Sequence, residues 1–392
     1  MVEKEAFMGC TNLSGININT TLSVIPTRCF QSCNSLTGVD IPSNIISIGT
    51  SSFFSCSELT GINFAEGIEA IGNSAFQSCI DLTGISFPNS LISIGVSSFN
   101  GCTSLSGELT YNQNLESVDD SAFANTDIVK INFNTNPNFT IIEDSCFTNC
   151  RDLTGIDLTA NITNINSNAF LGCSKLSGIN FNETITDIGN GAFQNCTSLI
   201  EVTYPESLIN VGTSAFKGCS NMETINFNTN AAFTNIAANC FENDTSLTTL
   251  TITDNIVNIN SSSFQGCNQI TTIDFGDFTK YIGVSAFQSC ISFNNLIIPD
   301  TVTGIDDSAF SSCSSLDTMS VFPEGLIDIG DSAFNNCPLT GINDVITIPD
   351  SVTDIGDSAF YNNKFSGFYL GANIDYLSPR TFESCVNLSG ID

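Results

Sequence analysis

The chain has 392 residues, of which 40 are acidic, 9 are basic and none is histidine, so its formal net charge is −31. So few basic residues argue against nucleic-acid binding and against attraction to anionic membranes, and the lack of histidine excludes Ser-His-Asp and Cys-His catalytic arrangements. The sequence shows no membrane-spanning apolar run and no signal peptide, which leaves the localisation open between the cytoplasm and export by an unrecognised route.

A phenylalanine recurs about every 23 residues along the whole sequence, usually within the phrase Ala-Phe-x-x-Cys. A fixed period of this size predicts a solenoid, in which each coil buries its apolar face against its neighbours. We therefore expect a single domain over residues 1–392 with about seventeen coils. Neither end carries a recognisable cap, which leaves open a truncated chain or end-to-end self-association of copies. The phenylalanines are Phe7, Phe30, Phe53, Phe76, Phe99, Phe123, Phe147, Phe170, Phe193, Phe216, Phe241, Phe264, Phe287, Phe310, Phe334, Phe360 and Phe382.

The first element expected in each repeat is a short strand that starts about eight residues after the phenylalanine. In the repeat of Phe30, Val39 and Ile41 alternate with polar positions, which is typical of a half-buried strand. Pro42 then ends the strand, because proline cannot donate to the ladder. A second extended segment with two apolar positions follows, here at Ile45 and Ile48.

The last element expected in each repeat is a short helical turn over Ala-Phe-x-x-Cys. Three residues before the phenylalanine stand Thr50, Asp120, Asp307 and similar residues. These residue types cap helix N-termini, where a side-chain oxygen accepts a backbone N–H. Each coil is thus predicted to contain a strand, a turn, an extended segment and a capped helical turn.

The full pattern, Leu-x-x-Ile-x-Ile-Pro-x-x-x-Ile-x-x-Ile-Gly-x-x-Ala-Phe-x-x-Cys, is carried nearly intact by residues 36–53 and 346–360. It resembles the BspA-like class of leucine-rich repeat. The resemblance implies a repeat solenoid: a right-handed leucine-rich-repeat superhelix with a parallel β-sheet on its concave face and short helical turns or extended segments elsewhere. It also implies non-catalytic binding of protein or matrix, often in microbial surface adhesins.

Most cysteines form a row three residues after the phenylalanines, interrupted at Thr126, Asp244 and Asn363. We interpret the row as buried structural thiols, because free cysteine behaves as a small hydrophobe. A disulfide ladder, or metal binding by pairs such as Cys29 with Cys33, is the alternative. We expect no cofactor and no metal. The row consists of Cys33, Cys56, Cys79, Cys102, Cys150, Cys173, Cys196, Cys219, Cys267, Cys290, Cys313 and Cys337, with Cys10 and Cys385 nearer the ends.

Two groups of residues are candidates for contact with a partner, which we expect to be a protein or a glycan. The first group occupies outward strand positions and the second is an aromatic cluster in the last coils, where the repeat length changes. The candidates are Asp40, Asn63, Asp157 and Asn180 on the strands, and Phe322, Tyr361, Phe368 and Tyr369 in the last coils. Two longer coils, with insertions at 134–138 and 228–232, are further candidates for specific contacts.

These features favour a non-enzymatic binding scaffold that contacts protein or glycan, with cell-surface adhesion as one role. An intracellular structural scaffold is the first alternative. The second is a solenoid carbohydrate-active enzyme, since Asp331 and Asp357 recur in register and could form an acid pair or bind calcium. Capping explains the same carboxylates without an ion.

Overall fold

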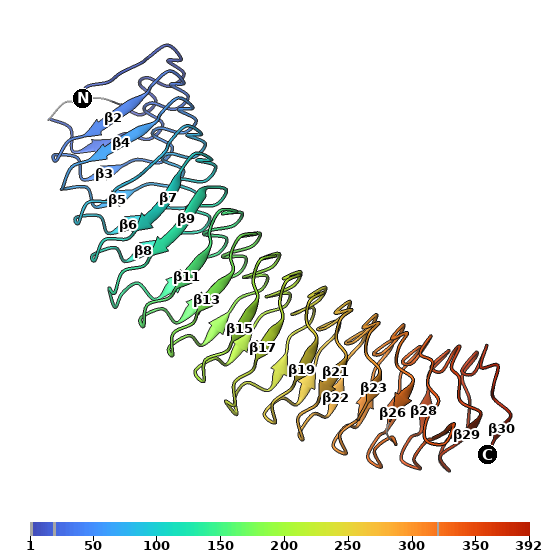
Figure 1. Cartoon of the computed structure of the whole chain (residues 1–392). Helices are drawn as coiled ribbons and strands as arrows, with labels where there is room; N and C mark the ends of the chain where they lie inside the picture. Colours follow the sequence, from blue (N-terminus) through green and yellow to red (C-terminus); the bar gives the residue numbers. More distant parts are fainter. Residues whose placement is uncertain (1–2, 19–20, 320) are drawn as a thin grey trace. The chain divides into compact units, whose positions relative to one another are not determined.

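The computed structural model describes residues 3–18, 21–319 and 321–392 and shows a parallel β-solenoid of about 16 turns. The predicted fold class is confirmed. Contacts group the chain into two compact units, unit 1 (Met1–Ser198) and unit 2 (Leu199–Asp392), and within each unit successive coils stack on one another (Figure 1). Most coils contribute one strand to a first row and, on another side of the coil, one strand to a second row.

In unit 1 both rows consist of short strands. The first row contains β2 (Gly38–Ile41), β4 (Gly61–Phe64), β7 (Ser106–Thr110), β9 (Asp127–Asn132), β11 (Gly155–Asp157) and β13 (Gly178–Asn180). The second row contains β1 (Val24–Ile25), β3 (Ser47–Ile48), β5 (Ala70–Ile71), β6 (Ser93–Ile94), β8 (Ser117–Val118), β10 (Ile141–Ile142), β12 (Asn164–Ile165) and β14 (Asp187–Ile188).

Unit 2 repeats this arrangement. Its first row contains β15 (Glu201–Thr203), β17 (Thr224–Asn226), β19 (Thr249–Thr251), β21 (Thr272–Asp274), β23 (Asn295–Leu296), β25 (Thr318–Met319), β27 (Val345–Thr347), β29 (Gly367–Tyr369) and β30 (Gly390–Ile391). Its second row contains β16 (Asn210–Val211), β18 (Asn235–Ile236), β20 (Asn258–Ile259), β22 (Tyr281–Ile282), β24 (Gly304–Ile305), β26 (Asp328–Ile329) and β28 (Asp354–Ile355).

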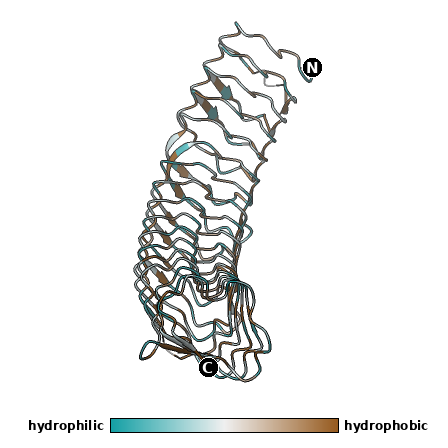
Figure 2. Cartoon of the chain, turned by 90° about the vertical axis from the view of Figure 1, so that its right-hand side faces the viewer, coloured by the Kyte–Doolittle hydropathy of each residue, from teal (hydrophilic) through white to brown (hydrophobic). Residues whose placement is uncertain are grey.

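Strand pairing sets equivalent residues of adjacent coils side by side. In β2 and β4, Val39 pairs with Ile62 and Asp40 pairs with Asn63. Val39 is buried while Asp40 is exposed, because successive side chains of a strand point to opposite faces. Hydrophobic and hydrophilic stretches accordingly alternate along each coil (Figure 2).

The repeated phenylalanines form stacks inside the units. The ring centroid of Phe53 lies 5.3 Å from that of Phe30 and 5.2 Å from that of Phe76, and the planes are nearly parallel. In unit 2 the ring of Phe287 lies 5.4 Å from Phe264 in the same way. Aromatic pairs at this spacing contribute about 0.5–1.5 kcal/mol beyond the area that they bury. The stack therefore explains why the phenylalanine is the most regular residue of the repeat.

The predicted helical turn around the phenylalanine is wrong, since the described residues contain strands and turns and no helix. Around Phe53, both Ser51 and Ser55 have positive φ, 54° and 55°. A left-handed residue two positions before and two after the phenylalanine cannot belong to a right-handed helix. It suits the third position of tight turns, which in this chain is occupied mostly by serine, asparagine and glycine.

Backbone N–H groups of this turn side point alternately within the coil and toward the next coil. Phe53 donates to the carbonyl of Ala75 in the next coil at 2.8 Å, whereas Cys56 donates to Phe53 within its own turn at 3.2 Å. The turn side is therefore a third hydrogen-bonded ladder, even though its residues do not have strand geometry.

The residues expected to cap helices do accept backbone N–H groups, but from the neighbouring coil. Oδ1 of Asp144 accepts from the N–H of Ser167 at 2.9 Å, and Oδ1 of Asp307 accepts from the N–H of Asp331 at 2.8 Å. The sequence signal for an acceptor was correct, and the assignment of its donor to a helix was not.

Candidate interaction surface

The predicted strand residues of unit 1 form two hydrogen-bonded pairs on the solvent side of the first row. Nδ2 of Asn63 donates to Oδ1 of Asp40 at 2.7 Å, and Nδ2 of Asn180 donates to Oδ1 of Asp157 at 2.5 Å. All four side chains are exposed. Strand register thus places equivalent polar groups of adjacent coils within contact, and the surface that they form is polar.

The pair Asp157 and Asn180 borders a hollow of about 320 Å³ on β9, β11 and β13. Gly155 and Gly178 leave the strand backbone bare there, and Lys130 stands at one side. The ammonium group of Lys130 lies 3.8 Å from the Glu108 carboxylate. The hollow offers hydroxyl, amide, carboxylate and ammonium groups, a set that suits a hydroxyl-rich ligand or a peptide backbone.

The four aromatic candidates of unit 2 do not form one surface. Phe322 is 3% exposed and Phe368 is 1% exposed, so both belong to the core and their assignment to a contact surface is corrected. The rings of Phe322 and Phe334 pack edge to face at 5.7 Å. Tyr361 is half-buried on the turn side, whereas Tyr369 is 47% exposed in β29. Of the four, only Tyr369 faces solvent on the first row.

Exposed apolar side chains that the sequence reasoning missed lie beside Tyr369. Val321 is 62% exposed and Ile342 is 53% exposed, and both line the same hollow as Tyr369, of about 330 Å³. For Ile342 the available signal was the spacing from Phe334 to Phe360, which at 26 residues is the longest in the chain, and for Val321 it was the spacing of 24 residues from Phe310 to Phe334. An insertion into a coil pushes residues out of the regular stack.

The cysteine row lies in the core and its thiols act as hydrogen-bond donors. Sγ of Cys56 donates to the carbonyl of Phe30 in the preceding coil at 3.1 Å, and Sγ of Cys79 does the same to Phe53. Burial raises the pKa of the Cys56 thiol to about 12, which keeps it protonated and unreactive. No disulfide joins cysteines in the described part of the chain. Thiol hydrogen bonds therefore join successive coils along the row, beside the phenylalanine stack.

The three interruptions of the row differ in how they replace the thiol. The Thr126 hydroxyl donates to the carbonyl of Phe123 at 2.8 Å, within its own coil. Nδ2 of Asn363 donates to the carbonyl of Phe334 in the preceding coil at 2.9 Å, which reproduces the bond of the thiol. Asp244 is fully buried, and neither of its carboxyl oxygens makes a well-formed hydrogen bond. Burial raises its pKa well above the ordinary value and outweighs the backbone N–H groups of Cys219 and Gly218, which lower the pKa.

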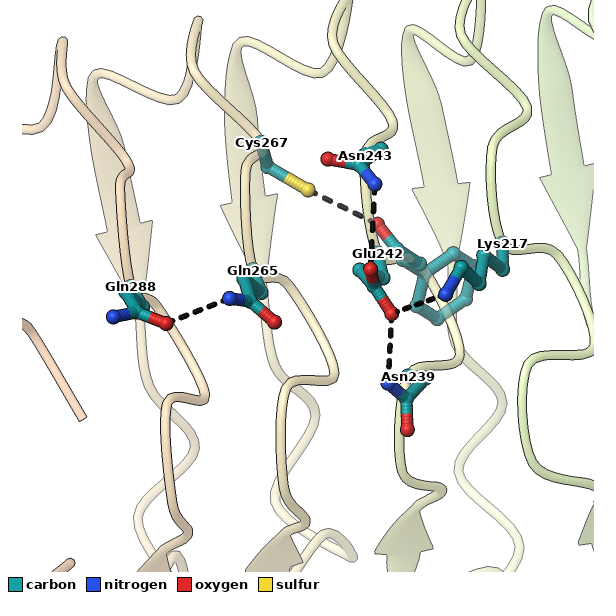
Figure 3. Close-up of polar contacts among 8 residues, drawn as sticks. Lys217, Asn239, Glu242, Asn243, Gln265, Cys267 and Gln288 are labelled. Atoms are coloured by element: carbon teal, nitrogen blue, oxygen red, sulfur yellow. Dashed lines mark hydrogen bonds and ion pairs between the residues drawn. The ribbon is translucent and has the colours of Figure 1, made fainter. Parts of the chain in front are cut away.

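The turn side of unit 2 carries a row of polar side chains one residue after the phenylalanine (Figure 3). The Lys217 ammonium lies 2.8 Å from Oε2 of Glu242, which also accepts from Nδ2 of Asn239 at 2.7 Å. In the next coils, Nε2 of Gln265 donates to Oε1 of Gln288 at 2.6 Å. The Lys217–Glu242 and Gln265–Gln288 pairs join adjacent coils, which makes these groups structural.

The recurrent carboxylates of unit 2 are engaged with the backbone and with a cation. Oδ1 of Asp331 accepts from the N–H of Asp357 at 2.7 Å. Hydrogen bonding from Ser358, together with Arg380 at 3.2 Å, lowers the pKa of Asp357. In residues 3–18, 21–319 and 321–392, no group of three or more Cys, Asp or Glu side chains is arranged to hold a metal ion.

The inserted asparagines join one coil to the preceding coil. Nδ2 of Asn134 donates to the carbonyls of Asn112 and Leu115 at 2.7 and 2.9 Å, and Asn134 is fully buried. Asn228 donates in the same way to Pro205 and Leu208. The start of each insertion is thus part of the scaffold.

The described chain also contains no helix long and apolar enough to cross a membrane.

The sequence pattern of the BspA type leucine rich repeat region matches this chain in six overlapping copies, over residues 1–106, 24–150, 69–199, 140–243, 234–345 and 321–392. The chain belongs to the BspA type leucine-rich-repeat family. The expected resemblance is confirmed over the whole length. No curated protein sequence matches the chain significantly.

Solved structures of bacterial leucine-rich-repeat proteins are similar to this family member. A protein from Bacteroides ovatus has a TM-score of 0.75 at 24% identity, over 97% of this chain and 94% of its own. A leucine rich cell surface protein from Faecalibacterium prausnitzii has a TM-score of 0.44 at 20% identity, over 95% and 83%. A protein from Eubacterium ventriosum has a TM-score of 0.47 at 18% identity, over 85% of each chain. The first similarity shows the shared fold.

Proposed function

We propose that this leucine-rich-repeat protein is a non-catalytic scaffold that binds a protein partner on its first strand row. The observation that carries the proposal is the concentration of exposed apolar side chains in the later coils. Among residues 3–18 and 21–277, no large hydrophobic side chain is more than half exposed. Seven that follow are more than half exposed: Phe278, Ile297, Val321, Ile327, Ile342, Tyr376 and Val386. Of these, Ile297, Val321 and Ile342 lie beside the first-row strands β23, β25 and β27. Exposed apolar side chains gathered in one region are characteristic of protein interaction sites.

The engagement of the carboxylates supports a binding role over a catalytic one. A glycosidase needs two carboxyl groups facing a substrate across a fixed gap. Asp331 and Asp357 instead face the backbone of the next coil and Arg380. The polar hollow beside Lys130, Asp157 and Asn180 favours a second candidate function, glycan binding by unit 1.

Site-specific photo-crosslinking tests which side of the coils meets a partner. A photoreactive phenylalanine analogue is placed at Ile297, which follows β23 of the first row, or at Ile327, which precedes β26 of the second row. The two isoleucines are matched, because each is more than half exposed and both lie in unit 2. Discrete protein adducts in source cells from position 297 alone are expected. Equal adducts from both positions, or none from either, would count against the proposal.

Protease treatment of intact source cells tests the adhesion role separately. Release of peptides from this chain before lysis would support a surface scaffold that contacts matrix or host molecules. Peptides found only after lysis would contradict adhesion and favour the intracellular scaffold.

A further inference from the structure

An inserted turn interrupts the first strand row of unit 2. Strands β25 and β27 belong to separate sheets, and the chain between them folds back so that Ile342 and Val345 form an antiparallel bridge. The two residues between them, Asn343 and Asp344, both have positive φ, 54° and 64°. This is the geometry of a type I′ turn, which favours Asn and Asp at its centre. The turn is thus an ordered protrusion from the solenoid.

Glycine at position 341 is required for this turn. Gly341 has φ 71°, and a Cβ atom there would lie 2.2 Å from the carbonyl oxygen of Val345 and 2.8 Å from Cδ1 of Ile346. No other residue fits this conformation and this close approach. The conformation of this turn therefore keeps the Ile342 side chain in solvent, although it is apolar.

The protruding turn forms one side of the hollow of about 330 Å³. Val321, Ile342 and Tyr369 are its exposed apolar side chains, and the buried side chains of Met319 and Ile346 form its base. We call Val321, Ile342 and Tyr369 the apolar patch. Partners insert bulky side chains into hollows of this kind, and such anchors dominate binding energy.

The charge around the apolar patch is strongly negative. From Asp300 to Asp392 the chain has 14 acidic and 2 basic residues, and one of the two, Arg380, is paired with Asp357. Exposed Asp317 and Asp344 lie in the coils that form the hollow. A surface of this sign attracts positively charged partners and disfavours acidic ones.

We propose that the apolar patch binds a polypeptide segment that carries a bulky apolar side chain between basic residues. The apolar side chain enters the hollow between Ile342 and Tyr369, and the flanking Lys or Arg side chains pair with Asp317 and Asp344. The inference rests on the proposed function and adds the site and the chemistry of the partner. The apolar character of the patch favours a polypeptide over a glycan.

A random 12-residue peptide library displayed on phage, selected against the full chain, tests the proposal. We expect enrichment of sequences with Leu, Phe or Trp between Lys or Arg residues. Synthetic copies of these peptides should bind the double variant Val321→Ser/Ile342→Ser at least about tenfold more weakly. They should bind Ile327→Ser, a matched exposed isoleucine on the second row, as they bind the unaltered chain. Their affinity should fall with rising salt.

Three results would overturn the proposal: no enriched peptides, enriched peptides without basic residues, or binding that the double variant leaves unchanged. Oligosaccharides that bind the chain and lose binding in the double variant would assign the patch to a glycan instead. Crosslinks at position 297 together with any of these results would retain the scaffold function and reject the patch. If no crosslinks form at position 297 and no peptides are enriched, both the scaffold function and the apolar patch as a binding site would be rejected.

Discussion

The outward positions at the start of the first-row strands are glycine in much of unit 1, as at Gly155 and Gly178, and threonine in much of unit 2, as at Thr249 and Thr272. The next position of each of these strands points inward and is apolar in both units, as at Ile156 and Leu250. Inward side chains must stack on the coils above and below, so their size is constrained. Outward side chains face solvent and at most contact their equivalents in adjacent coils, as Asn63 contacts Asp40, so the two units can differ there while they keep one core.

The phenylalanine stack provides the largest expected effect and tests whether the cores are equivalent. Phe99→Ala in unit 1 and Phe287→Ala in unit 2 each remove a fully buried ring that stacks on two others. Each should lower the free energy of unfolding by about 3–5 kcal/mol, from lost burial and the cavity that remains. Urea unfolding followed by circular dichroism measures both losses. A loss in one unit of less than half that in the other would show that the cores differ.

Asp244 is expected to destabilise unit 2 at neutral pH, in contrast to Thr126 at the equivalent place in unit 1. At the equivalent positions of other coils, a thiol donates a hydrogen bond to a carbonyl of the preceding coil. A carboxyl group can donate in this way only when it is protonated. Because burial raises the folded-state pKa of Asp244, stability is greatest below its ordinary pKa of about 4 and falls as the pH rises through the folded-state pKa. Asp244→Cys should therefore raise the free energy of unfolding by about 1–3 kcal/mol at pH 7.

The pH dependence separates this explanation from a general packing effect. The gain from Asp244→Cys should shrink as the pH falls toward 4, because the folded state is then protonated and the unfolded state begins to take up its proton. Thr126→Cys is the control, because the Thr126 hydroxyl already has an acceptor, and it should change stability by less than about 1 kcal/mol. A gain that stays constant between pH 4 and pH 8 would contradict the role of the proton.

Replacement of a unit 1 glycine by threonine tests whether the outer face is free to vary. Gly178 has no positive φ, and a Cβ atom at this position would meet no other atom within 4 Å. Gly178→Thr should therefore stabilise the fold by about 0.5–1 kcal/mol, since glycine loses more entropy on folding. Gly341→Ala is the opposite control and should cost about 1–3 kcal/mol, because its backbone is left-handed and crowded. Thermal unfolding should show a raised melting temperature for Gly178→Thr and a lowered one for Gly341→Ala.

The smallest expected effect concerns ion pairs across coils. The Lys217–Glu242 pair is partly shielded, with side chains 32% and 14% exposed, whereas the Lys175–Asp152 pair is 64% and 39% exposed. Lys217→Met should cost about 0.5–1 kcal/mol, and Lys175→Met should have almost no effect. The difference between the variants should diminish in 1 M salt. Equal effects in unfolding experiments would mean that shielding is unimportant here.

The sequence predicted the parts of the fold that depend on periodicity. The phenylalanine stack, the first strand row and the buried thiols each follow from one residue type recurring at one spacing. The turn side did not follow, because Ser, Thr, Asn and Asp are favoured both at helix N-termini and in left-handed turn positions. Residues such as Ser51 look the same in either setting.

The contact surface was predicted less well because it depends on strand register. A shift of one residue turns a side chain from the solvent to the core. The spacing of 22 residues between Phe360 and Phe382 shortens that coil, and Phe368 thereby pairs with buried Ile346 and turns inward. In the neighbouring coils, the changed lengths place Val321 and Ile342 outside. Spacing reveals that a coil is irregular, but packing decides which of its residues emerge.

The cross-coil hydrogen bonds have a consequence for how such a gene can change length. Donor and acceptor lie about one repeat apart, as in Asn63 with Asp40 or Cys56 with Phe30, 23 and 26 residues. Removal or duplication of a whole repeat leaves every donor opposite an equivalent acceptor, whereas loss of half a repeat misplaces all of them. The coil is thus the natural unit of duplication. Cys146 and Cys240, four coils apart in similar surroundings, have the spacing that a copied block of coils would leave.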